Sequence, residues 1–212
     1  AYLDNTPIIY EGRTKLSGNP ELPGRLLSFF GRVNYNYNET YMATLVMRAD
    51  GSSKFAPGNR WGYFPSVSAG WVISNEAFME RTSSWMDFLK LRASWGQNGN
   101  QNIAGFQYLA NIAFDSKYFF GDNKTNSFTR AYPSILANPD ITWETSEQIN
   151  VGLDTRFLNG RLSAVFDWYN KSTKDWLVQA PIVGIYGTGA PFVNGGDVRN
   201  RGVELGLGWN DQ

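Results

Sequence analysis

The most constraining feature of this sequence is an alternation of apolar and smaller residues that keeps its phase from Trp61 to Ser74. The odd positions include Trp61, Val67 and Trp71, and the even positions are mostly Gly and Ser. A period of two places successive side chains on opposite faces of a β-strand. The segment is much longer than the strand of about 5 to 6 residues that is typical of soluble proteins.

The same alternation recurs along the chain and predicts further strands. It is found in segments 31–37, 41–50, 89–96, 148–157, 161–169 and 202–209. A short turn at 38–40 joins two of these segments. Asn159 and Gly160 predict a second hairpin, because both residue types tolerate the positive φ of a type I′ turn. The sequence therefore predicts an all-β chain of antiparallel neighbours.

Short connections alternate with long ones, at 50–60, 99–142 and 183–201. This alternation is typical of outer-membrane barrels, whose short turns are periplasmic and whose long loops face outward. A longer connection at 75–87, on the short-turn side, predicts a short helix. Within 99–142, alternation at 106–112 and at 128–132 leaves open whether no strand or two strands cross the wall.

We therefore expect one domain over residues 1–212, with no internal linker. The predicted fold is a segment of an antiparallel up-and-down transmembrane β-barrel, with about 8–10 strands of a larger barrel. The turns at 38–40 and 158–160 are expected at one rim, and 51–59 at the other.

Aromatic content separates the two environments that alternating strands can meet, a soluble sandwich core or lipid. Phe, Trp and Tyr make up 16% of the chain although its mean hydropathy is −0.37. No apolar run is long enough for a transmembrane helix. Trp61 and Trp71 lie on one face, and at a strand tilt near 40° they would stand roughly 25 Å apart along the membrane normal. This spacing matches two aromatic girdles and favours the membrane barrel.

The predicted facing follows from this spacing. Odd residues from Trp61 to Ile73 would meet lipid, with Val67 near the bilayer centre, and Ser66 and Ser68 would point into the barrel. Trp and Tyr are favoured at membrane–water interfaces. The predicted interface aromatics are Tyr35, Tyr37, Tyr41, Trp61, Tyr63, Trp71, Trp95, Trp168 and Trp209.

Composition also excludes several functions. The chain has no Cys and no His, so Cys/His zinc sites, Ser-His-Asp triads and imidazole catalysis lack an essential group. Its 19 basic and 19 acidic residues leave no net charge to attract nucleic acid. Glu144 and Glu147 are three apart on a strand, hence on opposite faces, and cannot flank one glycosidic bond. We expect no enzyme activity, no catalytic residue, no cofactor and no metal.

Several segments resemble one family. They are Arg48-Ala49-Asp50-Gly51-Ser52-Ser53-Lys54-Phe55, 60–71 (RWGYFPSVSAGW), 89–96 (LKLRASWG) with Asn98-Gly99-Asn100, Trp143-Glu144, 150–154 (NVGLD), 167–171 (DWYNK) and 200–205 (NRGVEL). In this order they resemble the SusC/RagA type of TonB-dependent outer-membrane transporters. The resemblance runs from about Ser28 to the C-terminus, and one departure is Trp95, where the family more often has Tyr.

The resemblance implies a bacterial outer-membrane barrel, filled by an N-terminal plug and energised through TonB. It also implies a SusD-like surface lipoprotein as a lid and a glycan or peptide as the imported nutrient. The chain is too short for the whole transporter and is expected to be a fragment from the C-terminal half of the barrel, without the plug. Outer-membrane lipid would be its other partner, and no residue is assigned to substrate binding.

A second hypothesis remains open at this point. A soluble all-β carbohydrate-binding module would use exposed Trp and Tyr side chains as platforms for sugars. The two hypotheses differ in solubility, because a barrel wall requires detergent whereas a module would be a monodisperse soluble monomer.

Overall fold

The computed structural model describes residues 7–10, 13–16, 24–120 and 126–211, and its elements are almost entirely strands. The strands are β1 (Pro7–Tyr10), β2 (Arg13–Leu16), β3 (Leu26–Tyr37), β4 (Tyr41–Ser52), β5 (Trp61–Val72), β6 (Met86–Asn100), β7 (Ile112–Phe120), β8 (Asn126–Pro133), β9 (Glu144–Phe157), β10 (Leu162–Lys174), β11 (Leu177–Gln179), β12 (Phe192–Asn194) and β13 (Val198–Trp209). Three short 3-10 helices are η1 (Ile73–Asn75), η2 (Ala77–Thr82) and η3 (Gly184–Tyr186).

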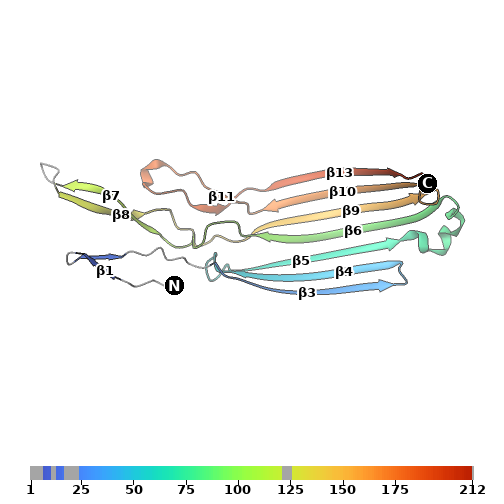
Figure 1. Cartoon of the computed structure of the whole chain (residues 1–212), viewed down its shortest axis with the longest axis horizontal. Helices are drawn as coiled ribbons and strands as arrows, with labels where there is room; N and C mark the ends of the chain where they lie inside the picture. Colours follow the sequence, from blue (N-terminus) through green and yellow to red (C-terminus); the bar gives the residue numbers. More distant parts are fainter. Residues whose placement is uncertain (1–6, 11–12, 17–23, 121–125, 212) are drawn as a thin grey trace.

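Seven long strands form one antiparallel sheet in the order β13-β10-β9-β6-β5-β4-β3 (Figure 1). Neighbours in space are neighbours along the chain except where β6 pairs directly with β9, and β10 with β13. At these two places the chain leaves the sheet to form the pairs β7–β8 and β11–β12. The predicted antiparallel up-and-down arrangement is confirmed, and the sheet is open, with β3 and β13 at its two edges.

The number of strands in the wall differs from the expected eight to ten, because seven of the described strands belong to the sheet. Alternation predicts a strand but not its partner, and β7 and β8 pair with each other beyond the end of the sheet. The predicted strand at 128–132 lies within β8. The alternation at 106–112 was misleading, because Phe106 has a φ of 62° and begins a turn. Strand β7 starts only at Ile112.

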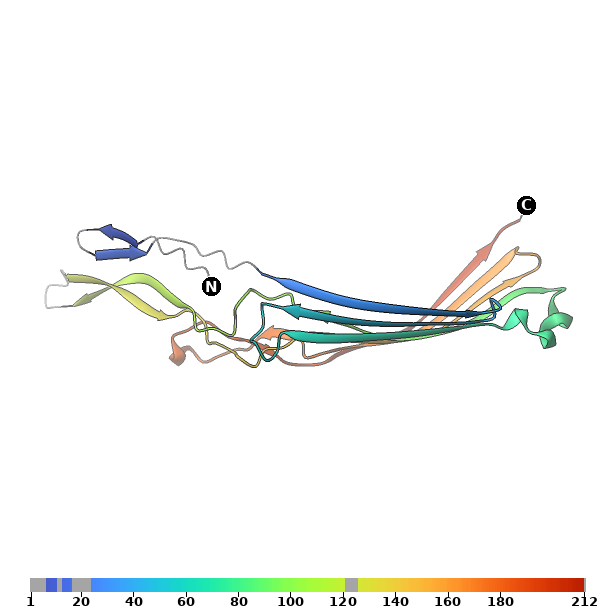
Figure 2. The same ribbon diagram turned by 90° about the horizontal axis from the view of Figure 1, so that it is seen from below.

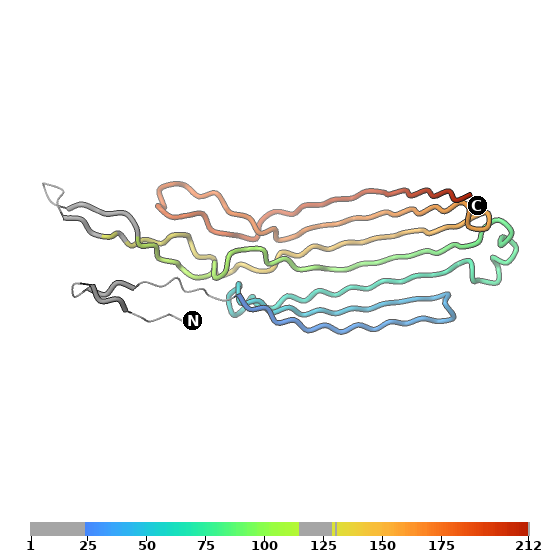
Figure 3. Tube along the Cα trace, in the orientation of Figure 1, coloured from blue at the N-terminus to red at the C-terminus, as the bar shows by residue number. Residues whose placement is uncertain are grey.

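The short turns lie at one end of the sheet and the long connections at the other (Figure 3). Asn38 and Glu39 have φ values of 50° and 54° in the β3–β4 turn, as a tight hairpin of right-twisted strands requires. The β9–β10 turn is built by Leu158, Asn159 and Gly160, all with positive φ, and so lies at the predicted positions 158–160. The helix expected at 75–87 is present as η1 and η2. The third long connection starts after Lys174 rather than at 183.

The sheet is curved into a trough, with both of its edges, β3 and β13, on the same side of β5 (Figure 2). We call the concave side the inner face and the convex side the outer face. The buried core is small and lies at the long-loop end, where it comprises Phe55, Phe64, Ile103, Ile141 and Trp143. Many large apolar side chains on the sheet remain exposed, including Val33, Tyr63 and Leu205. No helix among the described residues has the length and apolar character needed to cross a membrane.

Candidate functional site

The nine predicted interface aromatics all lie on the outer face. The register pairs Tyr37 with Tyr41 and Tyr41 with Trp71, so these rings stand in one row. Seven of the nine are exposed, and Trp71 and Trp95 are half-buried. The alternation therefore predicted correctly which residues share a face; their position at a membrane interface stays a prediction.

A polar contact ties together the aromatic row at the short-turn end. Tyr41 stacks on Trp71 with ring centroids 6.3 Å apart. The Tyr41 hydroxyl and the Trp71 indole N–H both donate to Oε1 of Glu76, at 2.5 and 3.0 Å. These two hydrogen bonds, the one from Tyr41 foremost, lower the pKa of the Glu76 carboxyl from its ordinary value. Glu76 lies in the connection between η1 and η2, so this connection is fastened to the aromatic row.

Two aromatic pairs on the outer face were not predicted. Phe29 stacks on Trp61 near the long-loop end, with centroids 6.2 Å apart. Trp85 stacks on Phe157 at the short-turn end, with centroids 5.9 Å apart. Phe29 precedes the alternating segment recognised in β3, and Trp85 lies in a connection where no periodicity marks its face. The register of the sheet was needed to find both pairs.

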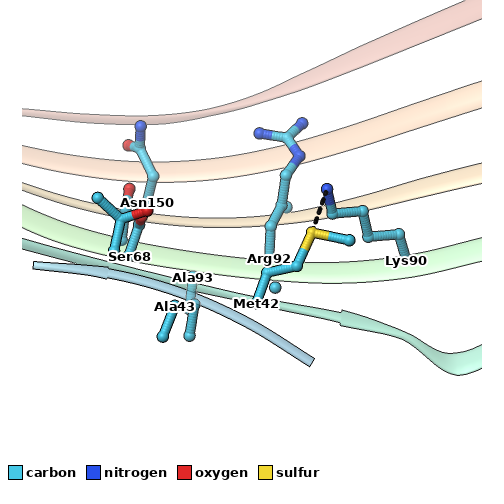
Figure 4. A pocket seen from close by; sticks show the side chains of 12 residues that line it. Met42, Ala43, Ser68, Lys90, Arg92, Ala93 and Asn150 are labelled. Atoms are coloured by element: carbon cyan, nitrogen blue, oxygen red, sulfur yellow. Dashed lines mark hydrogen bonds between the residues drawn. The ribbon is translucent and has the colours of Figure 1, made fainter. Parts of the chain in front are cut away.

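The inner face is polar and carries an ion-pair cluster across three strands. Arg92 on β6 donates from Nε to both carboxylate oxygens of Asp154 on β9, at 3.0 and 3.1 Å, and from Nη2 to Asp167 on β10, at 2.8 Å. Figure 4 shows Arg92 and Asn150 pointing to one side of the sheet and Ala43 and Ala93 to the other. The hollow drawn there has a volume of about 350 Å³ and is lined largely by small and polar residues of β4, β5, β6 and β9.

Gly152 provides the space for this cluster. It is the cross-strand partner of both Arg92 and Asp167. A Cβ atom at this position would lie 2.5 Å from Oδ1 of Asp167 and 2.6 Å from Cζ of Arg92. A side chain at position 152 would therefore separate the arginine from its carboxylates.

The long-loop end of the inner face is closed by the aromatic core. The Phe55 and Phe64 rings contact Trp143, with centroids 5.2 and 5.5 Å from it. The Trp143 indole N–H donates to the carbonyl of Arg60 at 2.9 Å. The Phe64 ring lies over Gly62 and Gly99, where an added Cβ would collide with it. These contacts hold the β4–β5 loop, β6 and the segment before β9 together.

The two glutamates that were considered as a glycosidase pair have separate structural roles. Glu144 accepts from Asn100 Nδ2 at 3.1 Å and from the backbone N–H of Leu177 at 3.1 Å. Glu147 lies on the outer face, where it accepts from the Trp95 indole at 2.7 Å and from Lys174 at 2.9 Å. The prediction that they occupy opposite faces is confirmed, because Trp95 belongs to the outer face and Glu144 lies beside the inner core.

Comparison with known families decides the class of this curved, two-faced sheet. Residues 3–211 match the family model described as TonB dependent receptor-like, beta-barrel. The chain belongs to the TonB-dependent receptor β-barrel family. The chain is 38% identical over 187 residues to TonB-dependent receptor SusC of Bacteroides thetaiotaomicron. It is 37% identical over 183 residues to TonB-dependent receptor P26 of Formosa agariphila. Each match covers 86% of this chain but 18% of the relative, so the chain spans about a fifth of the length of these receptors.

Solved structures of a peptide transporter and of a siderophore receptor agree with this assignment. The RagAB peptide transporter matches with a TM-score of 0.76 at 33% identity, over 87% of this chain and 20% of that one. The siderophore receptor PirA from Pseudomonas aeruginosa matches with a TM-score of 0.56 at 16% identity, over 86% of this chain and 30% of that one, and shows a shared fold. The resemblance stated from the sequence motifs is thereby confirmed. The comparisons give no support to a soluble carbohydrate-binding module.

The motifs that carry the resemblance meet in space within this TonB-dependent receptor segment. Arg92, Gly152 with Asp154, and Asp167 come from three motif segments and form the ion-pair cluster. Phe55, Phe64 and Trp143 come from three others and form the aromatic core. The motif residues described here thus join strands and loops to one another, a role that their sequence positions did not reveal.

Proposed function

We propose that this chain forms part of the barrel wall of an outer-membrane TonB-dependent nutrient transporter, with its outer face against lipid. The observation that carries the proposal is a slanted apolar belt on the outer face. We define the belt by the stretch of apolar outer-face residues on each strand. On the long-loop side it ends at Leu27 on β3, Trp61 on β5, Trp95 on β6, Ile149 on β9, Trp168 on β10 and Val203 on β13.

The slant has the magnitude that a tilted barrel strand requires. Strands lie about 4.8 Å apart and rise about 3.4 Å per residue, so a tilt near 40° shifts a horizontal plane by about 1.2 residues per strand. Six steps from β3 to β13 should shift the border by about seven residues. The register of the pairs keeps the border level from β3 to β5, places it six residues lower on β6 and β9, and eight residues lower on β10 and β13, so the total shift agrees with the expected one. A soluble sheet has no reason to displace its apolar border in this way.

The same slant explains the position of two aromatic residues. Trp95 is paired with Val67, which lies between Trp61 and Trp71, so it would be misplaced for a girdle if the strands stood upright. With tilted strands, Trp95 and Trp168 lie at the long-loop border of the belt together with Trp61 and Tyr63. Tyr35, Tyr37, Tyr41, Trp71 and Trp209 lie at or near the short-turn border. The outer face thus carries Trp and Tyr at both borders, as membrane interfaces favour.

The inner face supports the other half of the proposal. Charged and small polar side chains such as Arg92, Ser68 and Asn150 point to the concave side, as suits an aqueous interior or the surface of a plug. The two carboxylates of the ion-pair cluster, Asp154 and Asp167, are both held by Arg92, which suits a structural role. We infer a transport role, without catalysis, for residues 1–212 as a single wall segment of a longer protein.

Partners and substrate follow from the family. We infer a bacterial outer-membrane location, energy supplied through TonB, a plug supplied by the rest of the protein, and a SusD-like surface lipoprotein above the long loops. The solved RagAB neighbours are peptide importers, which favours a peptide as the cargo. A glycan is the other cargo that the resemblance to SusC/RagA transporters implies.

The test uses the full-length protein that contains this segment. It should fractionate with the outer membrane, migrate faster on gels before heating than after, and co-purify with a surface lipoprotein. Uptake of a labelled peptide or oligosaccharide pool should stop when TonB is removed. Recovery as a soluble monomer without detergent, or uptake that persists without TonB, would contradict the proposal.

A further inference from the structure

We propose that Arg199 and Arg201 form a binding site for the phosphate of an anionic lipid headgroup at the long-loop border of the belt. This inference rests on the proposed function, because it requires the outer face to meet a membrane. It adds a ligand site on the outside of the wall, away from the transport path.

The two arginines continue the lipid-facing row of β13. Arg201 pairs with Asn170 and Val203 pairs with Trp168 on β10. Side chains two apart on a strand share a face, so Arg199 and Arg201 lie on the same face as Val203, Leu205 and Leu207. Along this row the chemistry changes in one step from exposed apolar residues to two exposed arginines.

Neither arginine has a carboxylate partner within the part of the chain that the structure describes. The nearby carboxylates interact with a different cation, Lys174. Glu147 pairs with Lys174 at 2.9 Å, and Asp197 also attracts Lys174. The acidic charge at this border is thus directed to Lys174, which Arg199 repels, and neither guanidinium group is paired with a carboxylate of the described residues.

The position and the chemistry select the ligand. A guanidinium group presents several N–H donors in a plane and binds phosphate oxygens in pairs. Long basic side chains at the edge of a hydrocarbon layer extend toward the headgroups. The two arginines lie one strand repeat apart, about 7 Å, and directly above the apolar belt. They therefore suit the phosphate of a lipid whose acyl chains lie along Val203 and Leu205.

The test measures lipid binding by the full-length protein in detergent, by native mass spectrometry with added short-chain phosphatidic acid or phosphatidylcholine. The wild type should prefer phosphatidic acid. R199Q/R201Q should weaken binding of phosphatidic acid about tenfold, and R199K/R201K should retain most of it. The control R81Q removes an exposed arginine from η2 at the opposite rim and should bind as the wild type does. If R199Q/R201Q does not fold, R201Q alone should still weaken binding measurably.

Three results would overturn the inference: equal affinity of R199Q/R201Q and wild type, an equal loss in R81Q, or no preference of the wild type for phosphatidic acid. Inorganic phosphate alone binding as tightly as the lipid would also overturn it, because the belt would then contribute nothing. Heat-modifiable gel mobility is measured on every sample. A wild type that lacks it contradicts the proposed function, whereas a folded wild type without lipid preference contradicts this inference alone.

Discussion

Neighbouring residues of β5 face opposite environments, and the difference is clearest at Val67 and Ser68. Val67 is exposed on the outer face, between Trp61 and Trp71. Ser68 lines the hollow on the inner face. One step along the strand therefore exchanges the outer face, which we propose meets lipid, for the inner face.

An arginine should be tolerated very differently at these two positions. V67R would place a charge near the middle of the hydrocarbon layer, at a cost of roughly 2 to 4 kcal/mol. S68R keeps its charge in the polar interior, where crowding against the plug is the main cost. In the full-length protein, V67R should therefore show the lower refolding yield into bilayers and the greater loss of heat-modifiable mobility. Equal losses would show that the two faces are not different.

Protonation of Glu76 at low pH should destabilise the short-turn end of the sheet. Its pKa is lowered in the folded protein by the hydrogen bonds from Tyr41 and Trp71. The stabilisation is therefore complete above the ordinary pKa of the unfolded carboxyl and is lost as the pH falls through the lower folded pKa.

E76Q keeps an oxygen that accepts both hydrogen bonds but does not titrate. Between pH 6 and pH 3, the wild type should lose more protection of the backbone amides at 73–82 from hydrogen exchange than E76Q does. The same pH dependence in both proteins would assign the effect to another group.

At the scale of strands, glycines on the inner face decide how closely side chains from adjacent strands can approach. Gly152 lies between Arg92 and Asp167, and nothing larger fits without moving them. Gly206 on β13 also lies in a strand, but its added Cβ would have ordinary contacts, the nearest at 3.8 Å from Val165.

G152A should therefore destabilise the full-length barrel by about 1 to 3 kcal/mol, the usual cost of overpacking, because the ion pairs of Arg92 must separate. G206A should cost much less and serves as the matched control. Urea-induced unfolding in detergent micelles or bilayers measures both. An equal or smaller loss in G152A would show that Arg92 rearranges without cost.

The elements also show what sequence reasoning can and cannot provide. Alternation predicted β4, β5, β9 and β10 and their faces, because a face follows from the period of two alone. It did not reveal that β6 pairs directly with β9, because partner choice depends on where the chain leaves the sheet. The alternation at Phe106 was misleading for a different reason. Nothing in the local sequence distinguishes a strand from a loop that happens to alternate.

The sequence predicted features of the candidate site only where they depend on which face of the sheet a side chain occupies. The aromatic residues on the outer face followed from their parity. The contacts of Arg92 with Asp154 and Asp167 span as many as 75 positions of sequence, so they required the register. The same holds for Trp143, whose partners Phe55 and Phe64 lie in distant segments.

At the scale of the whole molecule, the curved sheet has an apolar outer face and a polar inner face, which we propose meet different media. The small buried core lies at the long-loop end, and the strands themselves expose their apolar outer face. In water such a sheet would leave a large apolar surface exposed, whereas in a membrane lipid covers it.

The most direct measurement of this claim is a scan of single spin labels from position 62 to position 71 in the full-length protein in bilayers. The segment itself has no Cys, so each label is introduced by one substitution on a background without other accessible cysteines. Collisions with oxygen report lipid, and collisions with a water-soluble nickel chelate report water. The account predicts that oxygen collisions peak at odd positions, most strongly at V67C, and are low at S66C and S68C. Equal accessibility at odd and even positions, or oxygen peaks at the even ones, would contradict it.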